Sequence, residues 1–324
     1  MNKNRFQNLT DIIQTDYRNM AGLIISKDQR VEYEYYGEGF SDVTTIHTAS
    51  VTKSIISILL GIALGQGGIK SIDQKVLEFF PEYTVKRGEK TIQTITLKHL
   101  LTMTAPYKTR SEPYTKVYSS NDWTMASLDL LGGKGTIGDF RYSTVCLQIL
   151  SGVLVRATGQ SLLDFANTYL FTPLGIEAVQ STRVQTKEEH LAFMKSSSPA
   201  GWVAGPEGVN TAGWGLCLKT TDMLKIGSLY LNRGEWKGRQ LLSSDWIQES
   251  TSKHSQWGHL EYGYLWWVLS DIGPHCYAAL GDGGNVIFVH PEEHVVIAVS
   301  STFMPRAKDR IELIRNTILP LLGI

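Results

Sequence analysis

Two kinds of hydrophobic pattern divide this chain and indicate where its strands and helices lie. Short apolar or alternating runs rich in β-branched and aromatic residues stand near the two ends, at 22–26, 31–36, 263–268, 285–289 and 294–300. Lys27 to Arg30 separates the first two runs, and Pro291 to Glu293 separates the last two, as turns between strands do. We therefore expect a hairpin over Ala21 to Tyr36 and further strands near the C-terminus.

Longer apolar segments lie between these runs and predict helices. They cover about 50–65, 96–103, 147–157, 161–170, 219–233 and 311–322. Gly67 and Gly68 follow the first segment and Gly234 follows the fifth, which is typical of helix ends.

Strands at both ends of the chain around a helical middle predict one sheet built from the two termini. The fold class expected is α/β (α+β), with a sheet lobe from residues 1–70 and 200–324 and a mainly helical lobe from residues 71–199. A site in the cleft between the lobes is the default expectation for such an arrangement.

Composition excludes several classes of partner. Among 324 residues, Lys+Arg and Asp+Glu both number 31, so the net charge is zero and no basic stripe points to nucleic acid. The longest apolar run, Ile55 to Leu64, is shorter than the roughly 20 residues that span a bilayer, so no membrane partner is expected. Met1 to Asn8 lacks the apolar core of a signal peptide, and we expect a cytoplasmic protein unless a signal sequence has been removed. The oligomeric state is left open.

The three cysteines, Cys146, Cys217 and Cys276, are widely spaced and odd in number. Each has apolar or aromatic neighbours. This favours reduced thiols in the core over disulfides or a zinc site.

Ser50 and Lys53 stand three residues apart at the start of the predicted helix 50–65. Positions i and i+3 share one face of a helix, so the amine can hold or accept the proton of the hydroxyl. The alternative is a capping serine and a solvent-reaching lysine. The same spacing recurs at Ser250 and Lys253, but in a polar stretch that predicts a solvated loop.

Two further motifs carry candidate chemistry. Tyr142 precedes the predicted helix 147–157, and a nearby lysine charge would lower the pKa of its phenol, so that it acts as a general base. The glycine-rich segment Leu280 to Asn285 precedes a strand, where glycines allow the backbone to approach a substrate. The backbone N–H groups of Ser50 and Asn285 could then form an oxyanion hole, and a plain turn between strands is the alternative.

In order and spacing, Ser50 to Lys53, Tyr142 to Thr144 and Asp282 to Gly284 resemble the three motifs of the class C β-lactamase and penicillin-binding-protein superfamily. That superfamily includes family VIII esterases and 6-aminohexanoate-dimer hydrolases. Segments between the motifs also resemble this superfamily: 96–104, 162–166, 170–176, 213–216 and 221–223. Together with the motifs, the resemblance extends from about Ala21 to Ser301. The resemblance implies a β-lactamase/transpeptidase-like fold, with an antiparallel sheet flanked by helices.

The resemblance also implies a mechanism through an acyl-enzyme. Ser50 would attack the carbonyl of a small-molecule ester or amide, Lys53 and Tyr142 would move the proton, and the N–H groups of Ser50 and Asn285 would hold the oxyanion. Thr144, Asp282, Gly283 and Gly284 are the candidate substrate-binding residues. No metal or organic cofactor is implied.

The chain departs from the family pattern at two of these positions. Thr144 stands where an asparagine is usual, and Asp282 stands where a lysine or histidine is usual. A carboxylate at that point repels a substrate carboxylate, so we expect an uncharged ester or amide, or a substrate with an amine, and poor β-lactamase activity. Asp282 could instead pair with a structural cation.

Alternative functions are a true β-lactamase or D-alanyl-D-alanine carboxypeptidase, and a non-catalytic ligand-sensing module.

His290 and His294 match a zinc-binding pattern, but Pro291 and two acids place them around a turn, which argues against a metal. No G-x-S-x-G elbow occurs, which argues against an esterase of the α/β-hydrolase type.

Aromatic residues of loop-like segments are candidates for lining a substrate pocket: Tyr107, Tyr114, Tyr118, Trp123, Trp202, Trp257 and Tyr262.

Overall fold

A computed structural model describes residues 5–324, and an antiparallel sheet of eight strands forms one side of the molecule. The spatial order is β2 (Arg30–Tyr36), β1 (Met20–Lys27), β14 (Val295–Ser301), β13 (Asn285–His290), β12 (Tyr277–Gly281), β11 (Trp267–Val268), β10 (Leu260–Tyr262) and β9 (Ser255–Trp257). β1 pairs with both β2 and β14. The predicted hairpin and the sheet shared by the two ends of the chain are therefore confirmed.

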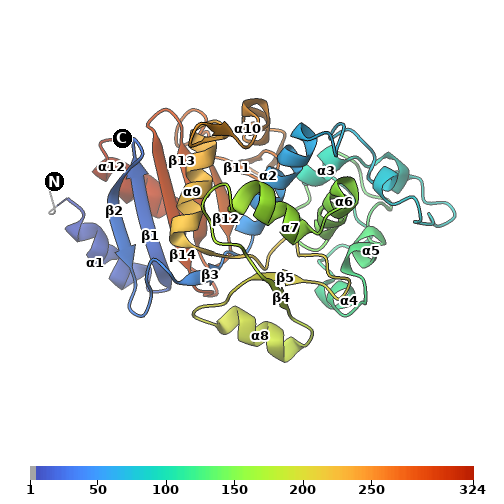
Figure 1. Cartoon of the computed structure of the whole chain (residues 1–324), viewed down its shortest axis with the longest axis horizontal. Coiled ribbons are helices and arrows are strands. Elements are labelled where there is room, and N and C mark those ends of the chain that lie inside the picture. The colour runs from blue at the N-terminus through green and yellow to red at the C-terminus, as the bar shows by residue number, and fades with distance from the viewer. Residues whose placement is uncertain (1–4) are drawn as a thin grey trace.

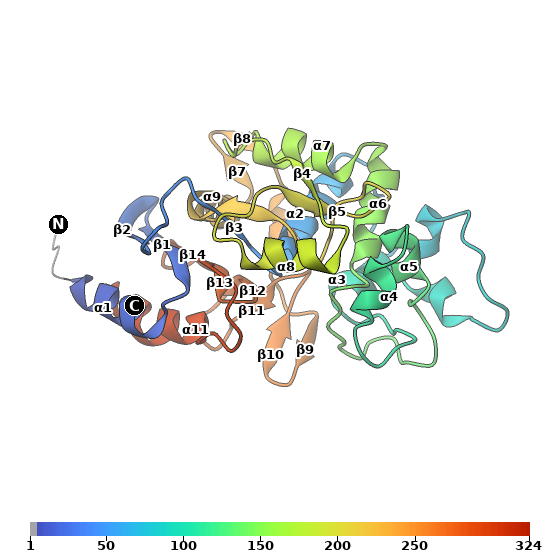
Figure 2. The same ribbon diagram turned by 90° about the horizontal axis from the view of Figure 1, so that it is seen from below.

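Helices cover both faces of this sheet (Figures 1 and 2). α9 (Thr220–Leu231) lies on one face. On the other face lie α1 (Gln7–Asp16) and the C-terminal helical segment. That segment consists of α11 (Arg310–Leu313), a π-helical turn (Ile314–Ile318) and α12 (Leu319–Leu321). Along β13 the side chains alternate between the two: Ile287 packs in the core that includes α9, and Phe288 packs with α1 and the C-terminal helices.

The predicted helix at 50–65 is α2 (Val51–Gly65), and it lies between the sheet and the other helices (Figure 1). Every residue from Val51 to Ala63 is buried, as expected for a helix that is apolar on all sides. It contacts β12 of the sheet and α6 (Gln148–Thr158) of the helical side. A residue at its N-terminus therefore lies where the two sides of the molecule meet.

The remaining elements lie mainly on the helical side or at its junction with the sheet. The helices are α3 (Leu97–Leu101), α4 (Tyr114–Tyr118), α5 (Trp123–Leu128), α7 (Leu162–Ala166) with a π-helical turn (Asn167–Phe171), α8 (Lys187–Lys195), α10 (Ser244–Ser250), and two 3-10 turns (Val76–Phe79 and Thr91–Thr94). Short ladders are formed by β3 (Thr45–His47) with β6 (Cys217–Lys219), β4 (Ser181–Arg183) with β5 (Trp202–Ala204), and β7 (Glu235–Trp236) with β8 (Arg239–Gln240). The predicted helices are thus present, and the division into lobes at residues 71–199 stays a prediction.

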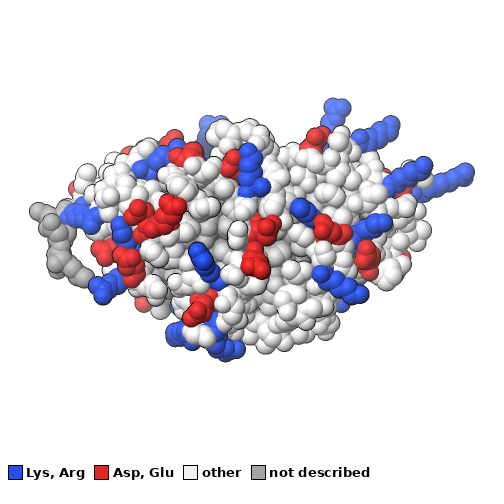
Figure 3. Space-filling model, turned by 90° about the horizontal axis from the view of Figure 1, so that it is seen from above, with Lys and Arg blue, Asp and Glu red and all other residues white. Residues whose placement is uncertain are grey.

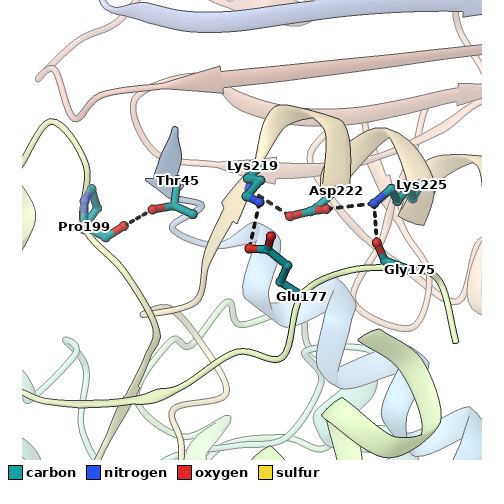
Figure 4. Close-up of polar contacts among 7 residues, drawn as sticks. All are labelled: Thr45, Gly175, Glu177, Pro199, Lys219, Asp222 and Lys225. Atoms are coloured by element: carbon teal, nitrogen blue, oxygen red, sulfur yellow. Dashed lines mark hydrogen bonds and ion pairs between the residues drawn. The ribbon is translucent and has the colours of Figure 1, made fainter. Parts of the chain in front are cut away.

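Polar contacts join the two sides near α9 (Figure 4). The Lys219 ammonium lies 2.9 Å from the Glu177 carboxylate, and Lys225 donates to the carbonyl of Gly175. On the neighbouring strand β3, the Thr45 hydroxyl donates to the carbonyl of Pro199 at 2.6 Å. These contacts fix the segments that follow α7 and precede β5 against the sheet side.

Two predictions about this part of the chain are wrong. The expected strand 263–268 is reduced to β11, because the Leu265 backbone has a positive φ of 64° and its N–H donates to Leu101, outside the sheet. The expected solvated loop at the second Ser-x-x-Lys sequence is also absent. Ser250 is fully buried at the end of α10, and its hydroxyl donates to the carbonyl of Ile247.

The structure of residues 5–324 bears on the expectations about a membrane span, a metal site and the cysteines. Within that range no helix has the length and apolarity to cross a bilayer, and no group of His, Cys, Asp or Glu side chains is arranged to hold a metal ion. The three cysteines are free and buried, as predicted. Figure 3 shows both signs of charge interspersed on the face drawn there. Of the segment Met1 to Asn8, which was considered as a signal peptide, residues 1–4 lie outside the described part of the chain.

Candidate active site

Ser50 immediately precedes α2, and Lys53 lies in the first turn of that helix. The Lys53 Nζ donates to the Ser50 Oγ at 2.8 Å, so the two residues meet as their spacing predicts. The preceding residue, Ala49, has a φ of +50°, an unusual value for a residue with a Cβ and typical of functional turns. This arrangement suits transfer of the hydroxyl proton to the amine.

Lys53 is almost completely buried, with only 1% of its surface exposed. Besides Ser50, its Nζ donates to the Thr144 Oγ1 at 3.2 Å and to the Gly213 carbonyl at 2.8 Å. Burial lowers the pKa of Lys53 to about 7, although the negative charge of Asp282 nearby acts in the opposite direction. Both protonation states of the amine are therefore populated near neutral pH.

Tyr142 lies beside the same pair, with the Lys53 Nζ 4.9 Å from the centre of its ring. Burial raises the pKa of the Tyr142 phenol well above its usual range, the Asp282 charge raises it further, and a hydrogen-bonding contact with Ser50 offsets only part of this. The prediction that lysine would lower this pKa is wrong. Burial dominates, and the ammonium faces the ring. The phenol is consequently protonated at neutral pH.

Glu112 holds the loop that carries Tyr142 and Thr144. Its Oε2 accepts the backbone N–H groups of Thr144 at 2.9 Å and Val145 at 2.8 Å. Thr144 is thereby placed with its hydroxyl toward Lys53. The sequence carried no signal for Glu112, because it lies more than 30 residues from the loop that it binds.

Gly281, at the end of β12, brings the sheet against Ser50. A Cβ at this position would overlap the Thr48 carbonyl oxygen and lie 3.2 Å from the Ser50 backbone nitrogen. The next residue, Asp282, lines the cavity beside Ser50. The N–H groups of Ser50 and Asp282 have no hydrogen-bond partner within residues 5–324.

Asn285 does not lie at the cavity wall, where the sequence predicts it. It is 1% exposed, and its amide nitrogen donates to the carbonyls of His47 and Asp282 while its oxygen accepts the N–H of Ser301. It does not line the cavities that contain Ser50. The structure therefore gives Asn285 a position that braces the turn before β13.

Gly283 and Gly284 form that turn with φ values of +82° and +98°, which glycine adopts without strain. The buried Arg310 lies under the turn, so that a Cβ on Gly284 would be 2.7 Å from the guanidinium Nε. Neither glycine lines the cavities at Ser50. Asp282, in contrast, is exposed there and forms no ion pair within the described chain, so the structure does not supply the structural cation considered above.

Two cavities open beside Ser50. The larger, of about 800 Å³, contains Tyr142 and is rich in carboxylates, which are Glu112, Asp271, Asp282, Asp309 and Glu312. Arg315 also lines it and pairs with Asp271. The smaller, of about 280 Å³, is lined mostly by aromatic and apolar side chains on the other side of Ser50.

The candidate aromatic residues divide between the cavities and the core. Tyr114 lines both cavities, Trp257 lines the larger one and Tyr118 the smaller one, while Trp123 lines a neighbouring pocket. The others are buried and line none of these pockets: Tyr107, Trp202 and Tyr262. Sequence reasoning missed several lining residues, which are Phe140, His190, Met194, Trp214 and Trp267. Their shared position depends on tertiary structure, and no local pattern marks it.

Comparison with known proteins identifies the family of this chain. A family model described as Beta-lactamase matches residues 5–321. The chain belongs to the beta-lactamase family. Among curated relatives, the 6-aminohexanoate-dimer hydrolase of Paenarthrobacter ureafaciens is 20% identical over 302 residues, which are 86% of this chain and 71% of that protein.

Solved structures agree on the fold of this family member. The octameric penicillin-binding protein homologue from Pyrococcus abyssi has a TM-score of 0.71 and 20% identity, covering 100% of this chain and 78% of that one. A penicillin-binding protein homologue from Caulobacter crescentus has a TM-score of 0.69 and 17% identity, covering 93% and 92%. The β-lactamase/transpeptidase-like fold and the resemblance drawn from the three motifs are confirmed.

Proposed function

We propose that this protein is a serine hydrolase that cleaves an ester or amide through an acyl-enzyme intermediate. The observation that carries the proposal is the 2.8 Å contact between the Lys53 amine and the Ser50 hydroxyl at the wall of two cavities. The hydrolase name of the Paenarthrobacter relative supports the same class of chemistry.

In the first step, unprotonated Lys53 accepts the hydroxyl proton while the Ser50 Oγ attacks the substrate carbonyl carbon. The carbonyl π pair moves to oxygen and forms an oxyanion. As that oxyanion collapses, the bond to the leaving group breaks and the Tyr142 phenol protonates the departing atom. The Lys53 ammonium then returns a proton to the phenolate, so that the acyl-enzyme carries no net charge change.

Hydrolysis of the acyl-enzyme uses the same groups. Lys53 takes a proton from water, the hydroxide attacks the acyl carbon, and the Ser50 oxygen leaves and recovers a proton from Lys53. The raised pKa of Tyr142 fits its role as a proton donor, and the lowered pKa of Lys53 fits the role of base.

For the oxyanion hole, the backbone N–H groups of Ser50 and Asp282 replace the pair that the sequence suggested. Both groups lack a hydrogen-bond partner within residues 5–324, and both residues line the cavities, whereas Asn285 is buried behind the turn. Each such donor typically lowers the reaction barrier by about 3 kcal/mol.

Chemical labelling tests the nucleophile. A fluorophosphonate should modify Ser50, and intact-protein mass spectrometry with peptide mapping would locate the label. Ser50→Ala should abolish labelling and lower the rate of ester hydrolysis by several orders of magnitude. Ser250→Ala is the matched control, because it removes the serine of the second Ser-x-x-Lys sequence and should leave labelling intact. Persistent labelling of the Ser50→Ala protein would overturn the proposal, and an unlabelled wild type would favour a ligand-sensing module.

The substrate follows from the charge at Asp282. We propose an uncharged ester or amide, or a substrate with an amine, because the unpaired carboxylate beside Ser50 repels a substrate carboxylate. Nitrophenyl butyrate should accordingly be hydrolysed faster than ampicillin or cephalothin. The opposite order would instead favour a β-lactamase or a D-alanyl-D-alanine carboxypeptidase.

A further inference from the structure

The smaller cavity at Ser50 has walls of a different chemistry from those of the larger one. We call it the aromatic pocket and define it by its lining: His47, Ala49, Ser50, Tyr114, Tyr118, Thr144, His190, Met194, Trp214 and Asp282. Its volume is about 280 Å³. α8, which supplies His190 and Met194, lies between β3 and the helices α4 and α5 (Figure 2).

We propose that the aromatic pocket binds the acyl group of the substrate, and that Met194 on α8 sets the length of acyl chain accepted. This assignment rests on the proposed serine hydrolase function and deepens it, since it defines the substrate as an ester or amide of a medium-sized apolar acid.

Tyr142 determines which half of the substrate occupies which cavity. The phenol lines the larger cavity but not the aromatic pocket, and the group that it protonates must lie beside it. The leaving group therefore occupies the larger cavity. The acyl group, on the other side of the carbonyl carbon that Ser50 attacks, is directed into the aromatic pocket.

Apart from Asp282, which also lines the larger cavity, the pocket presents mainly carbon surfaces, because its polar groups are occupied or uncharged. The Trp214 indole N–H donates to the Tyr118 hydroxyl at 2.8 Å. His47 Nε2 accepts the N–H of Gly215 at 3.0 Å, and burial lowers the pKa of His47 to about 4, so the ring is neutral at pH 7. An apolar acyl chain is thus favoured there over a charged one.

The volume of the pocket indicates the size of the acyl group. At about 30 Å³ for a water-sized group in the liquid, 280 Å³ accommodates roughly nine such groups. A hexanoyl or phenylacetyl group makes much better use of this space than an acetyl group does, and each buried methylene contributes about 0.8 kcal/mol.

Met194 and His190 are four residues apart and share one face of α8. Phe193 anchors the helix, with its ring centre 5.1 Å from that of His47 and 6.3 Å from that of Trp214. Leu191 is 42% exposed and lines none of these pockets. A change of size at Met194 therefore alters the pocket, whereas one at Leu191 does not.

The test is the kcat/KM profile for 4-nitrophenyl esters from acetate to dodecanoate, which share one leaving group. Wild type should prefer hexanoate to acetate by about tenfold or more. In Met194→Trp the hexanoate-to-acetate ratio should fall by about tenfold, because the indole fills the pocket, and Met194→Ala should move the optimum to longer chains. Leu191→Ala is the matched control and should keep the wild-type profile.

An unchanged profile in a folded Met194→Trp protein that still cleaves acetate overturns the pocket assignment, as does an equal shift in Leu191→Ala. Failure of the proposed hydrolase function would give a different result from failure of the pocket assignment, because no ester would then be cleaved and Ser50 would stay unlabelled. Circular dichroism and acetate hydrolysis verify that each variant is folded.

Discussion

The ionisation of Lys53 is the property of a single residue that most directly controls the proposed reaction. Its pKa is lowered to about 7 and the base must be unprotonated, so kcat/KM should rise with pH from 5, pass its midpoint near 7 and level off above 8. The pH profile for a neutral ester measures this. Lys53→Arg should lose activity by about a thousandfold, because a guanidinium stays protonated throughout that range.

Tyr142 offers the contrasting outcome. Since burial raises the pKa of its phenol, a tyrosinate base would give a rate that keeps rising beyond pH 9. Such a profile would contradict the assignment of Lys53 as the base and restore the role that the sequence suggested for Tyr142. Tyr142→Phe complements the measurement, because loss of a proton donor should slow esters with poor leaving groups more than nitrophenyl esters.

Asp282 provides a test of charge selectivity at one position. Asp282→Lys places a cation beside Ser50 in place of the carboxylate, while the backbone N–H of the residue is retained. The ratio of kcat/KM for a carboxylate-bearing ester to that for its neutral methyl ester should rise by about tenfold or more. An unchanged ratio would mean that the side chain does not meet the substrate, and Asp282→Asn separates loss of the negative charge from gain of a positive one.

At the scale of elements, the end of β12 and the start of α2 must stay in close contact. Gly281→Ala would force a Cβ into the Thr48 carbonyl and toward the Ser50 N–H, so kcat should fall by about a hundredfold although no polar side chain is lost. Gly65→Ala is the matched control, since this residue ends α2 with open space around its Cα and ordinary φ. It should leave kcat unchanged and stabilise the protein by up to about 1 kcal/mol.

The elements also explain which parts of the structure the sequence could predict. α2 and the β1–β2 hairpin follow from residues that are close in the chain, and so does the contact of Ser50 with Lys53. The pKa of Tyr142 could not be predicted, because it depends on burial by segments that are distant in sequence.

The same limit applies to the rest of the site. Glu112 reaches the Thr144 loop across 32 residues. Trp214 and Met194 line the same cavity because α8 packs against the segment after β5, with Phe193 of α8 beside Trp214. The sequence predicts the glycine-rich turn but not which side of it faces Ser50. Asp282, and not Asn285, lines the cavity, so the oxyanion donor that we propose differs from the one that the sequence suggested.

Across the whole molecule, a net charge of zero hides an uneven local distribution. Lys+Arg and Asp+Glu both number 31, and Figure 3 shows both signs mixed on one face. The larger cavity nevertheless collects five carboxylates, and among its lining residues Arg315 already pairs with Asp271. A cationic leaving group should therefore experience an attractive field near Ser50 that the total charge does not reveal.

Salt dependence of the rate measures that field. Butyrylthiocholine and its uncharged carbon isostere, 3,3-dimethylbutyl thiobutyrate, differ mainly in the charge of the leaving group. Raising the ionic strength from about 0.01 M to about 1 M shortens the screening length from about 30 Å to about 3 Å. The kcat/KM of the cationic ester should then fall by about tenfold, while that of the neutral isostere should change by less than about twofold. Equal responses of the two esters would show that the carboxylates of the cavity do not act on the substrate, and the preference for an amine would have to be abandoned even if Ser50 remained the nucleophile.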